Sequence, residues 1–440
     1  MQRNLFLTAL ILLTAISGSL GQVQHTSVPI GDAVSKALAK GSITGEGARP
    51  FHIRVEVSEP ENPQSPYQGA FEEWWASPDQ WRREVTDKDG MKQIIVVASG
   101  QKTEKDEGDY FPVWLRRFVN GVFDPIPNAA QWTGSGLMIE KTVFPNGAHT
   151  DACARTQSKI GSADRSTNVY FNVCFDEEGT LKFVLSPGYF IEFHDYRSFG
   201  KKKIARSLSD SPESGTNLVG QVTVLEDLSK SRDVTDLFTP LAADEDRFRE
   251  VQVSAETMEH LTAADPPIVW PTVHSGNIKG HEAVYASFDS QGRAREVWPL
   301  NSDNGGVDDS TRDQVRKWTI KPAIDKSGKP VQVNGSLVFA FETRIDDPLP
   351  ELSDAEIRQQ AITTVQPVWP VGSVKSGEIF EAEISVNEQG QLTGSAYPHS
   401  TAPVAAIMAM SDALRKWTFR PLIRNGKPQY FHGIVKFAIP

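Results

Sequence analysis

Apolar and polar residues alternate with a period of two along much of the first half of the chain. At the start of this pattern Ile53, Val55 and Val57 alternate with Arg54 and Glu56, which places the apolar side chains on one face of a strand. Similar runs, separated by short turns, follow at residues 67–76, 81–86, 93–98, 137–144, 169–176, 181–185, 189–196, 202–206 and 219–228. Helical spacing of apolar residues occurs at 112–123, with a short stretch at 32–39. The pattern predicts a mostly antiparallel sheet domain with few helices.

The last third of the chain repeats one pattern twice. Arg316-Lys317-Trp318-Thr319-Ile320-Lys321-Pro322 returns as Arg415-Lys416-Trp417-Thr418-Phe419-Arg420-Pro421, 99 positions later. A Val-Trp-Pro precedes each copy and a Gly-Lys-Pro follows it, in the same order and at nearly the same spacing. Two such copies indicate a tandem pair.

Each repeat has the periodicity of a small α+β unit. In the second copy, Phe380, Ala382, Ile384 and Val386 alternate with polar residues, and a Gln-Gly turn leads to a second strand. A helix is predicted at 404–416 and a closing strand at 430–439; the first copy matches with strands at 282–288 and 331–341 and a helix at 310–317. Both units are therefore predicted to be ββαβ, with one helix on a three-stranded sheet.

These patterns divide the chain into seven segments. We expect a signal peptide at 1–21, a leader at 22–48, the antiparallel domain at 49–230, a linker at 231–264, the first repeat at 265–345, a linker at 346–364 and the second repeat at 365–440. The fold class is α+β: a curved, half-barrel-like antiparallel sheet followed by two ββαβ domains.

The N-terminus has the layout of a secretory signal. Arg3 precedes an apolar run at residues 5–16, and small residues including Ser19 and Gly21 follow, so we expect cleavage before Gln22. The alternative is an uncleaved membrane anchor, although the run is shorter than the roughly 20 residues that a spanning helix needs. We expect an exported protein in the periplasm of a Gram-negative-type bacterium, either free or associated with a membrane.

Composition and the two cysteines refine this picture. The 440 residues are 39% hydrophobic and the net charge is −11 with basic residues scattered, which argues against a nucleic-acid partner. Cys153 and Cys174 are the only cysteines, and an isolated pair in an oxidising compartment is expected to form a disulfide. The alternatives are two buried thiols or a metal site that would also use His149 and Asp151.

The repeats resemble the C-terminal domain of TonB-type energy transducers. The resemblance rests on Glu388-Gln389-Gly390-Gln391-Leu392, on the run Ala413 to Pro421, and on Asn425-Gly426-Lys427-Pro428; it covers 365–440 and, more weakly, 265–345. The shared motif residues are expected to determine the fold and carry no chemistry, because aromatic rings seal the helix onto the sheet, proline stops the helix and glycine permits a tight turn. They are Trp318, Pro322, Trp417, Phe419, Pro421 and Gly426.

The TonB resemblance implies a binding function. Domains of that family add a peptide of a partner protein to the edge of their sheet, a mode that uses backbone groups. The chain departs from the family because it lacks a Pro-Lys or Pro-Glu rich spacer and its apolar N-terminus has a cleavage signal. The resemblance therefore favours binding of an envelope protein or peptide, with a membrane-anchored energy transducer as an alternative.

The first domain is similar to periplasmic lipoprotein carriers of the LolA type. The similarity rests on Tyr67-Gln68-Gly69 and on the run from Glu73 to Glu84 within residues 50–230. It implies a half-barrel that holds acyl chains on a concave face, where Phe71, Trp74, Trp75 or Trp81 would line an apolar groove. The alternative, which we favour, is that these residues fill a core against helix 112–123, because adjacent residues of a strand point to opposite faces.

No local motif for catalysis, a cofactor or a metal is present. The nine histidines are dispersed, and there is no His-Glu-x-x-His, Gly-x-Ser-x-Gly or Cys-x-x-Cys. We therefore predict a protein that is not an enzyme and has no cofactor. The main hypothesis is binding of an envelope protein by strand addition to a repeat, in transport across the envelope; the alternative is a carrier of lipid or lipoprotein that uses the first domain.

Overall fold

A computed structural model describes residues 24–143, 152–162, 165–211, 216–230, 234–242, 249–345, 350–369, 374–396, 402, 404–424 and 426–439. The predicted signal peptide, its cleavage site before Gln22, His149 and Asp151 lie outside these residues. In the part of the chain that is described, no helix has the length and apolar character needed to cross a membrane.

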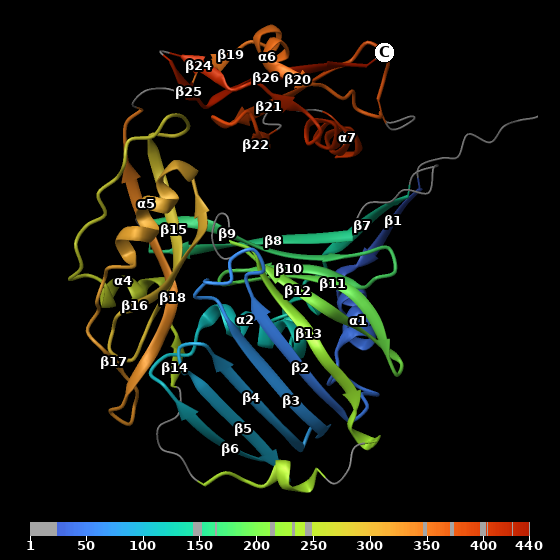
Figure 1. The fold of residues 1–440 in the computed structure, drawn as a ribbon, viewed down its shortest axis with the longest axis vertical. Coiled ribbons are helices and arrows are strands. Elements are labelled where there is room, and N and C mark those ends of the chain that lie inside the picture. Colours follow the sequence, from blue (N-terminus) through green and yellow to red (C-terminus); the bar gives the residue numbers. More distant parts are fainter. Residues whose placement is uncertain are drawn as a thin grey trace, which may run out of the picture.

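One antiparallel sheet of eleven strands makes up most of the first domain, as the alternation predicted (Figure 1). Its spatial order is β6-β5-β4-β3-β2-β13-β12-β11-β10-β9-β8, so the two ends of the domain's chain meet where β2 pairs with β13. The strands are β2 (Phe51–Ser58), β3 (Gly69–Ser77), β4 (Gln80–Asp87), β5 (Lys92–Ala98), β6 (Gln101–Glu107), β8 (Ala152–Gly161), β9 (Ser166–Phe175), β10 (Leu181–Ser186), β11 (Tyr189–Phe199), β12 (Lys202–Asp210) and β13 (Leu218–Asp227). The sheet is curved, and helices cover one of its faces.

Three helices and a two-stranded sheet complete this domain. They are α1 (Ile30–Gly41), α2 (Val113–Phe123), α3 (Ala129–Thr133) and the antiparallel pair of β1 (Gln24–Pro29) with β7 (Met138–Val143). The helices predicted at 32–39 and 112–123 are confirmed. The segment predicted as a leader is instead part of the domain, because Ile30, Val34 and Ala37 of α1 are buried in its main core.

The first repeat forms a mixed sheet in the order β14-β18-β15-β16, with β17 paired to β18. Its elements are β14 (Glu250–Gln252), α4 (Ala255–Leu261), β15 (Lys279–Phe288), β16 (Ala294–Ser302), α5 (Asp308–Val315), β17 (Ala323–Ile324) and β18 (Pro330–Glu342), with a short 3₁₀ helix η3 (Gly305–Val307) before α5. We call residues 250–345 repeat 1.

The second repeat has the same plan, with a central sheet in the order β19-β26-β21-β22. Its elements are β19 (Glu351–Leu352), α6 (Asp354–Gln360), β20 (Ala361–Thr363), β21 (Ile379–Val386), β22 (Leu392–Ala396), α7 (Val404–Leu414), β23 (Thr418–Phe419), β24 (Leu422–Arg424), β25 (Lys427–Gln429) and β26 (Phe431–Ala438). We call residues 350–439 repeat 2. The predicted order of strand, strand, helix and strand is present in both repeats, but this order alone does not identify a TonB domain.

Each repeat begins earlier than the sequence predicted. Ser254 caps α4 and Ser353 caps α6, 99 positions apart, and β14 and β19 each run parallel to the closing strand of their repeat. The predicted linkers at 231–264 and 346–364 thus contain elements of the repeats. The start of the first linker also covers the outer side of the large sheet through the 3₁₀ helix η2 (Thr235–Phe238), next to η1 (Leu228–Lys230) at the end of the first domain.

Aromatic residues of the repeat motif fill the two repeat cores. Trp318 contacts Phe339, with ring centroids 5.7 Å apart, and Trp417 contacts Phe437 at 5.9 Å. Phe419 is buried beside Trp417, whose Nε1 donates to the backbone oxygen of Val365. Pro322 and Pro421 lie in exposed turns after these aromatic residues, and Gly426 has a φ of +74° in the turn between β24 and β25.

Candidate apolar-ligand site

The helix-covered face of the large sheet is apolar along its centre. On β2 the side chains of Phe51, Ile53, Val55 and Val57 are all buried, and they belong to the core that also contains α1 and α2. The intervening residues of β2 are polar, Arg54 and Glu56 among them, and lie on the other face. The strand alternation therefore gives the sheet one face suited to apolar contacts.

A small cavity lies between this face and the helices. It has a volume of about 30 Å³, which is room for one or two water molecules. Gly121 allows the close approach of α2, since a Cβ there would lie 2.8 Å from Cδ2 of Leu208. The cavity is lined by Ala37, Leu38, Gly41, Gly121, Val122, Pro125, Ile126, Thr180, Leu181, Phe193, Tyr196, Ile204, Ala205 and Leu208.

A much larger cleft lies next to it, over strands β8 to β10. Its volume is about 560 Å³, within the range of about 300 to 1,000 Å³ that is usual for small-molecule sites. The apolar part of its wall comes from α3 and the sheet, and its rim is polar. The lining residues are Pro127, Asn128, Gln131, Trp132, Ser135, Thr156, Gln157, Ser158, Phe171, Val184, Leu185, Ser186, Pro187 and Gln252.

The connection from α2 to α3 separates the small cavity from the cleft. Pro125 and Ile126 line the cavity, whereas Pro127 and Asn128 line the cleft. Ile126 is fully buried, and the hydroxyl of Tyr189 donates to the backbone oxygen of Pro125 at 3.4 Å. Burial also raises the pKa of Asp124 at the start of the connection. The two hollows are therefore neighbours on one face of the sheet.

The four aromatic residues predicted to line a groove lie elsewhere. Phe71 and Trp75 are buried in the core, where Phe71 contacts Phe123 of α2 with ring centroids 6.0 Å apart. Trp74 points to the opposite face and stacks on His52 at 4.9 Å. Trp81 is partly buried against the same core. None of the four lines the cavity or the cleft; Phe71, Trp75 and Trp81 agree with the core interpretation, whereas Trp74 lies on the other face and agrees with neither interpretation.

Two ion pairs are buried in or beside the apolar face. Nε of Arg83 lies 2.6 Å from a carboxylate oxygen of Glu73, and Nη1 of Arg117 lies 2.8 Å from one of Asp210. Burial raises the pKa of both carboxyl groups, and the paired arginine acts against it in each case. Arg117 is part of α2, and Arg83 lies over the ring of Phe123 at the end of α2. Both pairs therefore constrain the packing of this helix, because removing one partner would leave an isolated buried charge.

Repeat 1 closes one side of this domain through a set of side chains that we call the docking face. They project from the side of the sheet opposite to the core of repeat 1, and several of them are polar although buried. The docking face consists of Tyr285, Ser287, Glu296, Trp298, Gln332 and Asn334. Tyr285 and Trp298 belong to the core of the first domain, so repeat 1 and that domain share one apolar cluster.

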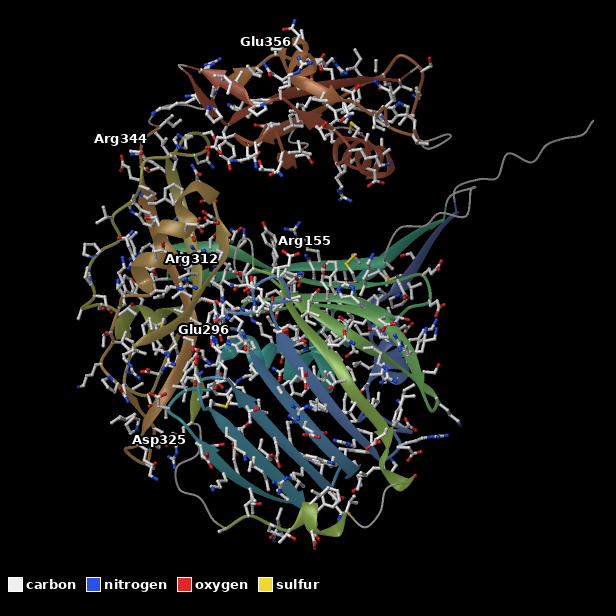
Figure 2. All side chains as sticks on the ribbon, viewed as in Figure 1. Arg155, Glu296, Arg312, Asp325, Arg344 and Glu356 are labelled. Atoms are coloured by element: carbon white, nitrogen blue, oxygen red, sulfur yellow. A yellow bond between two sulfur atoms is a disulfide. The ribbon has the colours of Figure 1, made fainter. Side chains whose placement is uncertain are left out.

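The carboxylate of Glu296 caps α2 (Figure 2). Helix α2 begins after Pro112 and has neither a capping side chain of its own nor an acidic residue in its first turn. The backbone nitrogens of Val113 and Trp114 donate to the two carboxylate oxygens of Glu296 at 2.6 and 3.1 Å. The hydroxyl of Tyr110 also donates to Glu296, at 2.6 Å. A residue of repeat 1 thus accepts hydrogen bonds from the first backbone nitrogens of α2, the helix that borders the cavity.

Gln332 extends this contact to the backbone before α2. Its side chain accepts from the backbone nitrogen of Phe111 at 2.9 Å and donates to the backbone oxygen of the same residue at 3.1 Å. Burial raises the pKa of Glu296, although the hydrogen bonds from Tyr110 and Val113 oppose this change. The docking face therefore recognises residues 110–114 through both backbone and side-chain groups.

The sequence contained signals for this contact that the period-two pattern alone did not reveal. Ser287, Glu296, Gln332 and Asn334 are polar residues in strands that are otherwise rich in apolar residues. A helix with no cap of its own is a second signal, because its first backbone nitrogens need acceptors. Neither signal identifies the two partners of the contact, since they are separated by more than 170 residues.

The disulfide prediction is confirmed. Cys153 of β8 and Cys174 of β9 are bonded and face each other across the strand pair, with Cα atoms 4.1 Å apart. The bond lies in the strands that form one wall of the cleft. It fixes the edge of the sheet at that wall.

Comparisons with known proteins give few matches. No family model and no curated protein matches the chain. Among solved structures, the chain is similar to a putative outer membrane lipoprotein-sorting protein domain from Vibrio parahaemolyticus, with 11% identity and a TM-score of 0.25 over 47% of this chain and 95% of that one. It is also similar to a LolA superfamily protein from Nitrosomonas europaea, with 10% identity and a TM-score of 0.22 over 48% of this chain and 98% of that one.

The second structure is named as a LolA superfamily protein, and LolA is the family to which residues 50–230 were likened from their sequence. Superpositions with TM-scores this low do not establish a shared fold. They give no support to the TonB resemblance of the repeats.

Proposed function

We propose that this protein is an exported carrier that binds the acyl chains of a lipid or lipoprotein in its first domain. The observation that carries the proposal is the cleft of about 560 Å³ beside the apolar, helix-covered face of the sheet. Trp132, Phe171, Val184 and Leu185 supply apolar wall, and serine, threonine and glutamine side chains at the rim suit the polar end of an amphipathic ligand. The protein works by binding, without catalysing a reaction, in the periplasm after removal of residues 1–21.

A brominated lipid tests this proposal directly. Bromine quenches tryptophan emission at short range, and Trp132 lines the cleft. We expect a brominated acyl lipid to quench the emission of the chain that begins at Gln22 in a saturable way, whereas the same lipid without bromine does not. The variant Trp132→Phe should lose a large part of that quenching.

The matched control is Trp74→Phe, which removes a tryptophan from the other face of the sheet. This variant should keep the quenching that Trp132→Phe loses. Equal quenching in the two variants, or no saturable quenching in the unaltered chain, would contradict binding in the cleft.

Strand addition to repeat 2 is a second candidate function, and the sequence of β22 favours it. This strand ends the sheet order of repeat 2, and it carries neither the charged residues nor the proline that usually protect an edge strand. An envelope protein or peptide could extend the sheet there by backbone pairing. Replacing Thr393 and Ser395 by lysine in the full chain should abolish capture of that partner and leave lipid quenching unchanged.

A further inference from the structure

Repeat 1 contains two neighbouring carboxyl groups in a position that repeat 2 fills with apolar side chains. Glu282 on β15 lies opposite Phe339 of β18, and in repeat 2 the residue opposite the equivalent Phe437 is Phe380. Asp308, the first residue of α5, lies ten positions before Trp318, as Ile407 lies ten positions before Trp417. The fold of the repeat therefore does not require acidic residues at these two positions.

The carboxyl group of Glu282 is buried, and its immediate neighbours are the hydroxyl of Ser302 and the carboxyl group of Asp308. The residue has no exposed surface, and neither of its two carboxylate oxygens makes a hydrogen bond in the described part of the chain. One carboxylate oxygen of Asp308 is also buried without a hydrogen bond. Glu282, Asp308 and the hydroxyl of Ser302 are close enough to interact directly with one another. Two ionised carboxylates in such proximity would be strongly unfavourable without a neutralising proton or cation, and burial together with the nearby Asp308 and Asp303 raises the pKa of Glu282 to about 9.

A basic side chain close to this pair is shared with two other carboxylates. Arg312, on the next turn of α5, is near enough to act on Asp308. Its guanidinium lies 2.8 Å from Asp309 and 3.4 Å from Asp313 (Figure 2). Asp303 and Asp309 add negative charge around the pair. The region around the pair is therefore negative.

We propose that Glu282 and Asp308 form a binding site for a hard divalent cation of the Ca²⁺ class. The donor atoms are carboxylate oxygens and the Ser302 hydroxyl, which Ca²⁺ prefers to nitrogen or sulfur. A divalent ion would neutralise both carboxylates. Among the described residues no group of three or more histidine, cysteine, aspartate or glutamate side chains converges, so backbone oxygens of the loop before α5 and water complete the shell of six to eight ligands.

Ca²⁺ binding would bridge β15 to the start of α5 and stabilise the repeat that docks onto α2. Asp308 is only partly buried, which gives an ion a path from solvent, whereas the buried position of Glu282 leaves little space for the tightly held water shell of Mg²⁺. The inference does not depend on the ligand of the first domain.

Calorimetric titration and thermal unfolding of the chain from Gln22 test the site. After treatment with a chelator, the unaltered protein should bind one Ca²⁺ with a Kd of about 0.1 to 1 mM, the range of extracellular Ca²⁺ modules, and its unfolding temperature should rise. Glu282→Gln should weaken binding at least tenfold. The control Glu342→Gln, an exposed residue of β18 that pairs with Lys279, should bind as the unaltered protein does.

A second variant has, at these two positions, the apolar residues that repeat 2 carries there. Glu282→Phe with Asp308→Ile should give a folded chain whose unfolding temperature does not change with Ca²⁺. If the unaltered protein shows neither heat nor stabilisation with about 5 mM Ca²⁺, the two carboxyl groups share a proton and the proposal is wrong. Undiminished Ca²⁺ binding by Glu282→Gln would also overturn it.

Discussion

The two repeats have one architecture and different surroundings. In each, a tryptophan before the first long strand and a tryptophan after the helix contact one phenylalanine of the closing strand: Trp270 and Trp318 on Phe339, and Trp369 and Trp417 on Phe437. Each repeat has an apolar core of its own, and repeat 1 in addition contributes Tyr285 and Trp298 to the core of the first domain. These inward-facing aromatic residues are alike in the two repeats, so they determine the fold and do not decide how each repeat is used.

The outward-facing residues account for the difference. Glu296 and Gln332 of the docking face correspond, at an offset of 98, to Gly394 and Tyr430 in repeat 2, which lack the carboxylate and the amide that hold residues 110–114. Tyr430, just before β26, and Ile434 within it remain 37% exposed. The contact with the first domain therefore depends on a few residues of β15, β16 and β18 whose side chains point away from the core of the repeat.

Core tryptophan substitutions should have the largest effect and should separate the two repeats. Trp318→Ala and Trp417→Ala each remove a buried indole, which is expected to cost about 3 to 5 kcal/mol. Trp417→Ala should lower the stability of repeat 2 alone, whereas Trp318→Ala should destabilise repeat 1 and loosen α2 as well. Hydrogen exchange resolved by segment measures both. Equal loss of protection in α2 in the two variants would contradict the shared core.

Removal of the disulfide should act on the first domain. A bond that closes a loop of 21 residues contributes about 3 kcal/mol by the chain-entropy estimate. The double variant Cys153→Ser with Cys174→Ser should lower the unfolding temperature of the first domain and leave that of repeat 2 unchanged. Differential scanning calorimetry checks this, and a shift of both transitions would show that the repeats are not independent.

Loss of the Glu296 carboxylate should break the docking contact. Glu296→Ala leaves the first backbone nitrogens of α2 without acceptors, at an expected cost of about 1 to 3 kcal/mol. The amides at the start of α2 should then exchange faster. The matched control is Glu383→Ala on β21 of repeat 2, a half-buried position equivalent to Tyr285, which should leave α2 unchanged. Unchanged protection of α2 in Glu296→Ala would show that the cap contributes little.

The smallest expected effect is a dependence on pH. Because burial raises the pKa of Glu296 in the folded protein, the folded state holds this proton more tightly than the unfolded state does. The contribution of this proton to the free energy of unfolding is complete at pH values below the ordinary glutamate pKa of 4.5. It falls as the pH rises toward the raised pKa of the folded state, by at most about 1.4 kcal/mol per pH unit. The stability difference between the unaltered protein and Glu296→Gln should shrink over that window in urea titrations. A difference that grows with pH would mean that the carboxylate is stabilised in its ionised form.

The sequence predicted what depends on local periodicity. Alternation located most strands, the repeated Trp and Gly residues located the repeats, and the lone cysteines predicted their bond. The sequence did not predict β6, because the run Lys102 to Glu107 is almost entirely charged. Its division into two faces follows only from its pairing with β5. Residues 30–41 were also misread as part of a leader, since the burial of α1 depends on strands that come much later in the chain.

The candidate site was harder to predict for the same reason. The cleft is assembled from α3, β8, β9, β10 and β14, which span more than 120 residues, and no short motif marks it. The conspicuous aromatic cluster at Phe71, Trp74 and Trp75 drew attention to strands whose rings fill the core or lie on the other face. Long-range pairing of strands, which periodicity does not encode, decides which apolar residues are left to line a hollow.

Lipid analysis of the native protein tests the central claim most directly. The chain is purified from its host without detergent, its first residue is determined, and bound lipids are extracted and identified by mass spectrometry. The account predicts a chain that begins at Gln22 and carries an acyl lipid in near-stoichiometric amount, reduced in a variant such as Leu185→Glu that places a charge in the cleft. A chain free of lipid that also takes up none from added vesicles would contradict it.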